Sequence, residues 1–297
     1  MAKIHSIYRY PIKGLSPEPL PRATLVPDAT IPGDRLYAIE NGPSGFDPAA
    51  PAYLAKTHFL MLMKNERLAS LRTAFDQESH VLTIALSSPL VGEGGMGGRE
   101  GRSLPSTPAS HLPTPTPNSS PQGGGENKIS ADLRTAAGRA AIERFFADYC
   151  ADELRGPPKI LHAAGHSFSD VARKVVSIIN LSSVAAIETM VDAPVDPLRF
   201  RGNVYVEGLP AFSELDLVGQ ELKIGRRAAG ATNQTVRLKV VRRIVRCAAT
   251  NVDPMTGIRD LEVPQALLRH LGHADCGIYA EVVEGGGIAA GDEVEII

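Results

Sequence analysis

The chain has 297 residues, with 31 Lys and Arg against 33 Asp and Glu, so its formal net charge is −2. Its 43% hydrophobic and 22% charged residues are ordinary for a globular protein and exclude a wholly disordered chain. The near-neutral charge argues against attraction of the whole protein to nucleic acid or to anionic lipid.

The first 90 residues predict a β-rich domain. Alternating side chains favour strands over 3–10, 20–26 and 35–40, with a turn at 32–34. An antiparallel pair is predicted over 68–75 and 81–86.

Residues 91–125 differ in composition from the rest of the chain. Nine Gly, six Pro, five Ser and three Thr make up 23 of these 35 residues. Such a segment cannot bury enough apolar area to offset its ordering entropy, so a disordered insertion is predicted over 91–128. The alternative is a polyproline II recognition segment, for example at 113–117.

After the insertion, apolar residues at helical spacing predict a helical connector over 129–165, with its helix at 134–152. Residues 166–297 then predict a second domain, which starts with a strand at 175–180 and a helix at 182–190. Further strands are expected over 203–206, 221–224, 236–245, 277–283 and 293–297. Short strands with glycine-rich turns are typical of a mostly antiparallel barrel with a few helices, so the predicted fold class is mostly β with α (α+β).

The three cysteines, Cys150, Cys247 and Cys276, are odd in number and widely spaced, which disfavours a disulfide framework and an ordinary iron–sulfur cluster. The chain shows no signal-peptide pattern and no apolar run near the ~20 residues of a membrane helix. We therefore expect a cytoplasmic protein with no membrane or nucleic-acid partner.

The clearest charge pattern in the sequence is a basic segment that ends just before Cys247. Residues 226–246 contain no acidic residue and seven basic ones: Arg226, Arg227, Arg237, Lys239, Arg242, Arg243 and Arg246. Guanidinium groups beside a thiol lower its pKa and favour the thiolate, which acts as a nucleophile or a soft-metal ligand. A break in the alternation at Val241-Arg242 predicts a β-bulge. A solvated basic strand with an inert cysteine, or a nucleic-acid patch, would give the same pattern.

Three other motifs carry weaker signals. The turn-type sequence 253–257 begins six residues after Cys247 and is placed to wall a pocket around the thiol. His270, His273 and Cys276 have a spacing that could align three zinc ligands on a helix. Residues 180–183 join a predicted strand to a predicted helix, where amides and hydroxyls can bind phosphate.

Together these residues resemble the MOSC family, the C-terminal domain type of molybdenum cofactor sulfurases. The chain is most similar to the subgroup with an added N-terminal β-barrel domain, which includes the amidoxime-reducing components and bacterial proteins that detoxify N-hydroxylated bases. The matching pieces are Tyr10-Pro11-Ile12-Lys13-Gly14, Gly33-Asp34-Arg35, 59–71, 179–183, Arg199-Phe200-Arg201-Gly202-Asn203, 246–257, 277–280 and 291–294. The resemblance implies an antiparallel β-barrel MOSC core at 166–297 and a β-barrel-like N-terminal domain at 1–90.

The resemblance also implies a molybdenum cofactor, in which Cys247 is the catalytic residue and a ligand of the molybdenum. The residues implied to hold the pterin and its phosphate are Lys13, Arg35, Ser182, Arg201, Asn203 and Arg246. This set agrees with physical expectation, because a phosphorylated cofactor needs fixed cations and forked hydrogen-bond donors.

The implied reaction is the reduction of an N–O bond in a small N-hydroxylated substrate to an amine, by a molybdenum-dependent oxidoreductase. A separate ferredoxin, flavoprotein or haem protein would supply the electrons. The alternative is a protein that carries molybdenum cofactor or activated sulfur without reductase turnover. Pyridoxal phosphate binding is a further, more distant association of the family.

One prediction concerns the insertion. Replacing residues 91–125 by a short Gly/Ser link should leave the fold intact and change the free energy of unfolding by roughly 1 kcal/mol, a loop-closure effect. Urea denaturation of both chains measures this difference. Loss of soluble expression, or a much larger fall in stability, would mean that the segment packs against the rest of the protein.

Overall fold

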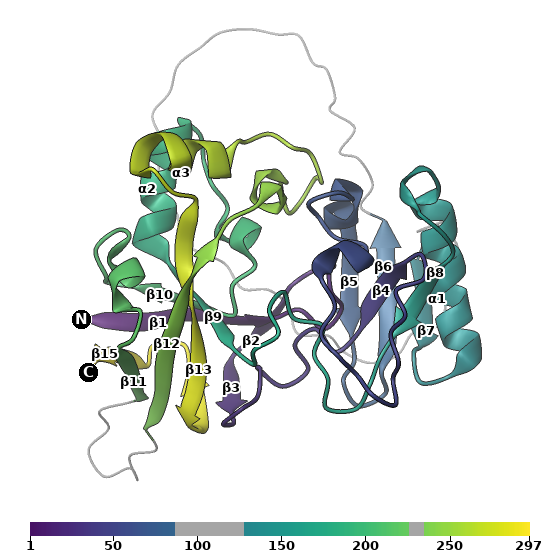
Figure 1. Ribbon diagram of the computed structural model, residues 1–297, viewed down its shortest axis with the longest axis horizontal. Coiled ribbons are helices and arrows are strands. Elements are labelled where there is room, and N and C mark those ends of the chain that lie inside the picture. The colour runs from purple at the N-terminus through teal and green to yellow at the C-terminus, as the bar shows by residue number, and fades with distance from the viewer. Residues whose placement is uncertain (87–127, 226–234) are drawn as a thin grey trace, which may run out of the picture.

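The structure is a computed structural model that describes residues 1–86, 128–225 and 235–297. Its regular structure is mostly strand, and two β-rich lobes lie side by side in Figure 1. The predicted insertion at 91–128 lies outside the described residues, apart from Lys128, which begins strand β7.

Seven strands close into a barrel in the first lobe. Their order around the barrel is β1, β10, β9, β13, β12, β11 and β15, which returns to β1. The neighbours are antiparallel except β9 and β10, which are parallel and joined through helix α2 (Leu181–Val191). This confirms the expected mostly antiparallel barrel. The seven strands are β1 (Ala2–Arg9), β9 (Val176–Asn180), β10 (Val204–Glu207), β11 (Glu221–Gly225), β12 (Val236–Val245), β13 (Asp275–Glu284) and β15 (Glu293–Ile296).

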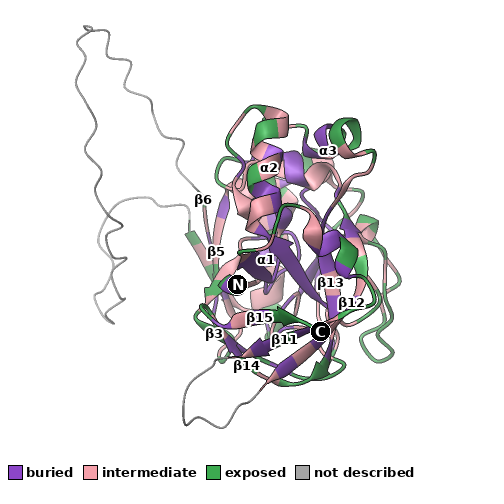
Figure 2. Cartoon of the chain, turned by 90° about the vertical axis from the view of Figure 1, so that its left-hand side faces the viewer, coloured by how far each residue is buried: buried purple, intermediate pink, exposed green. Residues whose placement is uncertain are grey.

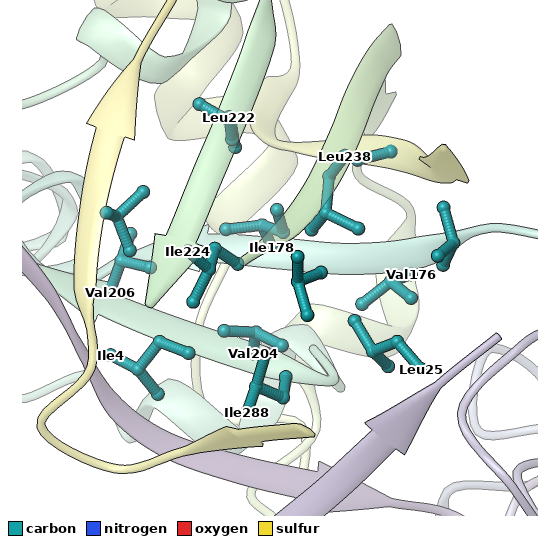
Figure 3. Close-up of a cluster of buried hydrophobic side chains, with 14 of the residues drawn as sticks. Ile4, Leu25, Val176, Ile178, Val204, Val206, Leu222, Ile224, Leu238 and Ile288 are labelled. Carbon is teal, nitrogen blue, oxygen red and sulfur yellow. The ribbon is translucent and has the colours of Figure 1, made fainter. Parts of the chain in front are cut away.

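Alternating side chains fill the barrel. Along β12, Val236, Leu238 and Val240 are buried while Arg237 and Lys239 between them are only partly covered. Figure 3 shows the apolar side chains from several strands meeting in this core. This core is the largest apolar cluster of the described chain. Burial of each such side chain stabilises the fold by about 1.5–3 kcal/mol. The register shifts between Val240 and Arg242, so the predicted bulge is confirmed.

The second lobe combines two small sheets with helix α1 (Ala136–Tyr149). One sheet has the order β5 (Leu71–Phe75), β6 (Val81–Leu86) and β7 (Lys128–Asp132), and the other pairs β4 (Ala38–Asn41) with β8 (Pro158–Leu161). Ile142 and Phe146 of α1 are buried in the same cluster as Leu82 and Ile84 of β6. The segment 129–165, expected as a helical connector, therefore adds two strands and a helix to this core.

The lobes are not consecutive in sequence. Strand β1 belongs to the first 90 residues, yet it lies between β10 and β15 in the barrel, because both of those strands would otherwise be exposed edges. Strand β2 (Glu18–Leu20) extends the sheet from β1, and β3 (Arg22–Leu25) pairs with β14 (Gly286–Ala289).

Helices α2 and α3 (Val263–Leu271) pack together at one end of the barrel, as Figure 2 shows. The predicted helix at 182–190 is α2, and its cap is Asn180, whose side chain accepts a hydrogen bond from the amide of Ser182. Sequence periodicity did not find β7, β8, β14 or α3. Among the described residues, no helix combines the length and the apolar character that a membrane crossing requires.

Candidate functional site

Cys247 lies between the end of β12 and the short 3₁₀ helix Ala248–Asn251, where the two lobes meet. Its half-buried thiol lines a pocket of about 200 Å³. A smaller cavity of about 60 Å³ adjoins this pocket and shares Cys247 with it. Both lobes contribute walls. The two cavities have six lining residues in common: Arg35, Lys56, Asp170, Arg201, Cys247 and Ala249.

Lys56 is the cation nearest to the thiol. Its Nζ lies 3.4 Å from Cys247 Sγ. Burial alone would lower the pKa of Lys56, but its interactions with Cys247 and Asp170 outweigh that effect and raise the pKa. Sequence analysis missed Lys56, because it begins a 3₁₀ helix of only three residues, Lys56–His58, in the other lobe, which is too short to show a periodic pattern.

Lys13 and Asp170 form an ion pair at the base of the site. The buried Lys13 Nζ donates to the Asp170 carboxylate and, at 2.9 Å, to the carbonyl of Phe168. Burial lowers the pKa of Lys13, and Asp170 opposes that shift. Burial would raise the pKa of Asp170, but the charges of Lys13 and Arg35 hold it well below its usual range. Asp170 also lacked a sequence signal.

Arg35 and Arg201 stack on one tyrosine. Their guanidinium carbons lie 4.8 Å and 4.2 Å from the centre of the Tyr10 ring. Both residues have a left-handed backbone, with φ of 50° and 51°. Arg35 also donates to Asp34 and, at 3.3 Å, to the carbonyl of Arg201. The guanidinium of Arg201, by contrast, has no hydrogen-bond acceptor among the described residues.

The basic run before Cys247 does not form one surface. Arg242 lines the pocket, with its guanidinium carbon 5.9 Å from the centre of the Tyr279 ring. Arg237 instead pairs with Glu221 and Glu284 outside the pocket. Arg243 donates to the carbonyl of Leu215. Arg226 and Arg227 lie outside the described residues.

Arg246 lines the pocket, but its donors bind the backbone. Its Nη1 donates to the carbonyl of Phe200 at 2.9 Å, and its Nε donates to that of Cys276 at 2.6 Å. These bonds tie the end of β12 to β13 and to the segment that carries Arg201. The contacts of Arg246 are therefore those of a residue that positions its neighbours.

Two further residues from the sequence prediction do not line the pocket. Asn203 is buried, and its Oδ1 accepts from the amide and hydroxyl of Ser177, which does line it. Ser182 lies in the first turn of α2, away from both cavities around Cys247. The side chains of Asn180 and Ser183 beside it are buried and hydrogen-bonded to Glu214.

The sequence 253–257 forms the predicted turn. Asp253 Oδ1 accepts from the amides of Met255 and Thr256 at 2.9 and 2.7 Å, and Gly257 has a φ of 74°. The turn walls an apolar pocket of about 230 Å³ that shares Arg201 with the thiol pocket. The buried Arg199 supports this wall, since its guanidinium binds Asp253 and both oxygens of Asp260.

Comparison with known proteins agrees with this arrangement. A MOSC domain model matches residues 162–295, and a MOSC N-terminal beta barrel domain model matches residues 1–96. The chain belongs to the MOSC family. No curated protein matches it.

Two solved structures are similar to this MOSC protein. The YuaD protein from Bacillus subtilis has 14% identity and a TM-score of 0.41, over 99% of this chain and 94% of that chain. YiiM from Geobacillus stearothermophilus has 17% identity and a TM-score of 0.31, over 41% of this chain and 53% of that chain. Family membership rests on the two family models.

The other cysteines of the MOSC protein differ from Cys247 in exposure. Cys150 and Cys276 are 1% and 0% exposed, and burial raises the pKa of each thiol to about 12.

Cys276 lies in β13, beyond the end of α3, so it does not share a helix face with His270 and His273. In the described parts of the chain, no group of three or more His, Cys, Asp or Glu side chains could hold a metal ion. The zinc alternative therefore has no support here.

The exposure of the three thiols predicts their reactivity. In cofactor-free protein, made in a host without molybdopterin, iodoacetamide should modify Cys247 rapidly and spare Cys150 and Cys276, because alkylation needs an accessible thiolate. Mass spectrometry of the peptides measures this, and urea should make all three thiols react. Comparable native labelling at Cys150 or Cys276 would contradict the burial described above.

Proposed function

We propose that this MOSC protein binds the molybdenum cofactor through Cys247 and reduces the N–O bond of small N-hydroxylated compounds. The observation that supports the proposal is the accessible Cys247 thiol, 3.4 Å from the Lys56 ammonium group, in a pocket lined by further cations. A thiolate is a suitable ligand for a soft, sulfur-bound metal centre. Family membership supports the same cofactor.

The cations around the thiol fit an anionic ligand. Arg201 and Arg242 have no hydrogen-bond acceptor among the described residues, although both line the pocket. Arginine forks suit phosphate, because two parallel N–H groups match two oxygens. Lys13 and Arg35 lie at the lobe boundary, where their charges would face the same group. We therefore propose that Lys13, Arg35 and Arg201 hold the cofactor phosphate and pterin.

When bound, the cofactor supplies the two-electron chemistry of the reduction, in which R–NHOH, two electrons and two protons give R–NH₂ and water. The residues of the chain position the cofactor and supply protons. Lys56 carries a proton at Nζ beside Cys247, which makes it the nearest proton source to the thiol in this arrangement. Arg246 and Asn203 act indirectly in this proposal, by holding the strand ends that carry Cys247 and Ser177.

The electrons would come from a separate electron-transfer protein of the ferredoxin, flavoprotein or haem class. The second candidate function is a carrier of molybdenum cofactor or sulfur without turnover, which the same thiol and cations also suit. A chemical electron donor separates these two functions, because an enzyme reduces a substrate with it and a carrier does not.

The first test is metal content. Protein from a molybdopterin-competent host should contain close to one molybdenum per chain, Cys247→Ala should contain almost none, and the control Cys150→Ala should keep it. Elemental analysis measures all three. With the loaded protein, reduced viologen should drive amidoxime reduction. Full molybdenum retention in Cys247→Ala would refute the ligand assignment, and loaded protein without reduction would favour the carrier.

The second test compares two arginines. Arg201→Lys should lose several-fold more cofactor on dialysis than Arg237→Lys, because a planar fork becomes a point donor at Arg201. Arg237 pairs with Glu221 and Glu284 away from the pocket, so the same change there should have little effect. Cofactor content is measured after dialysis at low and high salt. Equal loss in both variants would mean that the cations act only as a diffuse field.

A further inference from the structure

Asp170 is the one acidic side chain among the described residues that line the Cys247 pocket and the small cavity beside it. It lies on the segment between β8 and β9, which connects the two lobes. Its carboxylate pairs directly with Lys13. Its charge also acts on three more cations of the site: Arg35, Lys56 and Arg201. Asp170 thus holds the position that an anionic ligand of these cations would take.

The backbone of this segment is anchored while the Asp170 side chain is accessible. The Tyr53 hydroxyl donates to the carbonyl of Asp170 at 3.1 Å. Two residues earlier, the amide of Phe168 donates to the carbonyl of Arg35 at 2.8 Å, and the carbonyl of Phe168 accepts from Lys13. The Asp170 side chain nevertheless remains 48% exposed. A rotation about its own bonds would take the carboxylate into solvent without moving the chain.

We propose that Asp170 is an internal counter-anion that competes with the anionic ligand for Lys13 and Arg35 and leaves them when the ligand binds. The proposal rests on the proposed function only in requiring that these cations bind an anion. Asp170 then determines which ligands the site accepts. A monoanion merely replaces one carboxylate charge by another, whereas a dianionic phosphate group gains attraction in proportion to its extra charge.

The counter-anion also has a protective role in the empty site. Lys13 is buried, and a buried ammonium group without a partner is strongly unfavourable. Asp170 satisfies it until the ligand arrives, at the expense of affinity for that ligand. Removal of the carboxylate charge should therefore strengthen anion binding, which is the opposite of what truncation of an ordinary binding residue does.

The experiment uses inorganic phosphate as the probe and the full, cofactor-free chain. Calorimetric titration at pH 8 compares the parent protein with Asp170→Asn, which keeps the shape of the side chain, and with Asp170→Glu, which keeps the charge. The matched control is Asp216→Asn, which removes the same charge from an exposed residue paired with Arg243 outside the pocket. Asp170→Asn should bind phosphate at least about tenfold tighter, while the other two variants stay within about twofold of the parent.

A second measurement does not depend on the variant folding. In the parent chain labelled with ¹³C at aspartate, the carboxyl resonance of Asp170 should shift during the phosphate titration, because the carboxylate exchanges Lys13 for water. The resonance of Asp216 should stay in place. Unchanged or weaker phosphate binding by a folded Asp170→Asn, an Asp170 resonance that does not move, or no phosphate binding by any chain would overturn the proposal. Because no molybdenum is present, these outcomes are independent of the Cys247 test.

Discussion

The pairing of β1 with both β10 and β15 is the constraint on which the site depends. A barrel without β1 would leave two strand edges open, so the N-terminal strand is held between strands from the other half of the chain. The register places Ile7 opposite Val204, and the amide of Tyr8 donates to the carbonyl of Asn203. The chain that leaves β1 therefore passes the segment before β10, which brings Tyr10 against Arg201. The same closure delivers Lys13 to the boundary between the lobes.

The second constraint is electrostatic. Several cations are concentrated around one thiol, and like charges in a partly desolvated pocket repel. The structure offsets this repulsion in three ways. Tyr10 presents its ring to Arg35 and Arg201, Asp170 neutralises Lys13, and backbone carbonyls accept from Arg246. Among the described residues, the guanidinium groups of Arg201 and Arg242 have no hydrogen-bond acceptor, whereas that of Arg246 donates to backbone carbonyls.

The frame itself is a set of buried polar contacts behind the pocket. Arg199 joins the Asp253 turn to Asp260, Asn203 holds Ser177, and Glu214 joins the start of α2 to β13. Removal of one member of such a network leaves its partners buried and unpaired, which costs far more than a surface contact. Several residues of the family pattern therefore hold neighbouring segments in place, and only some of them line the pocket.

Most barrel strands, the bulge in β12 and the turn at 253–257 could be predicted from the sequence, because neighbouring residues encode each of them. The sequence also marked Lys13, Arg35 and Arg201 through the family resemblance. Lys56 and Asp170 join them only in the folded protein, since a three-residue 3₁₀ helix and a loop carry these residues and only the packing of the lobes brings them to the thiol. The packing also places Ser182 away from the pocket and Asn203 behind it, where Asn203 accepts a hydrogen bond from Ser177. A linear pattern records residue type and spacing, whereas the direction of a side chain and its hydrogen-bond partners depend on contacts between distant segments.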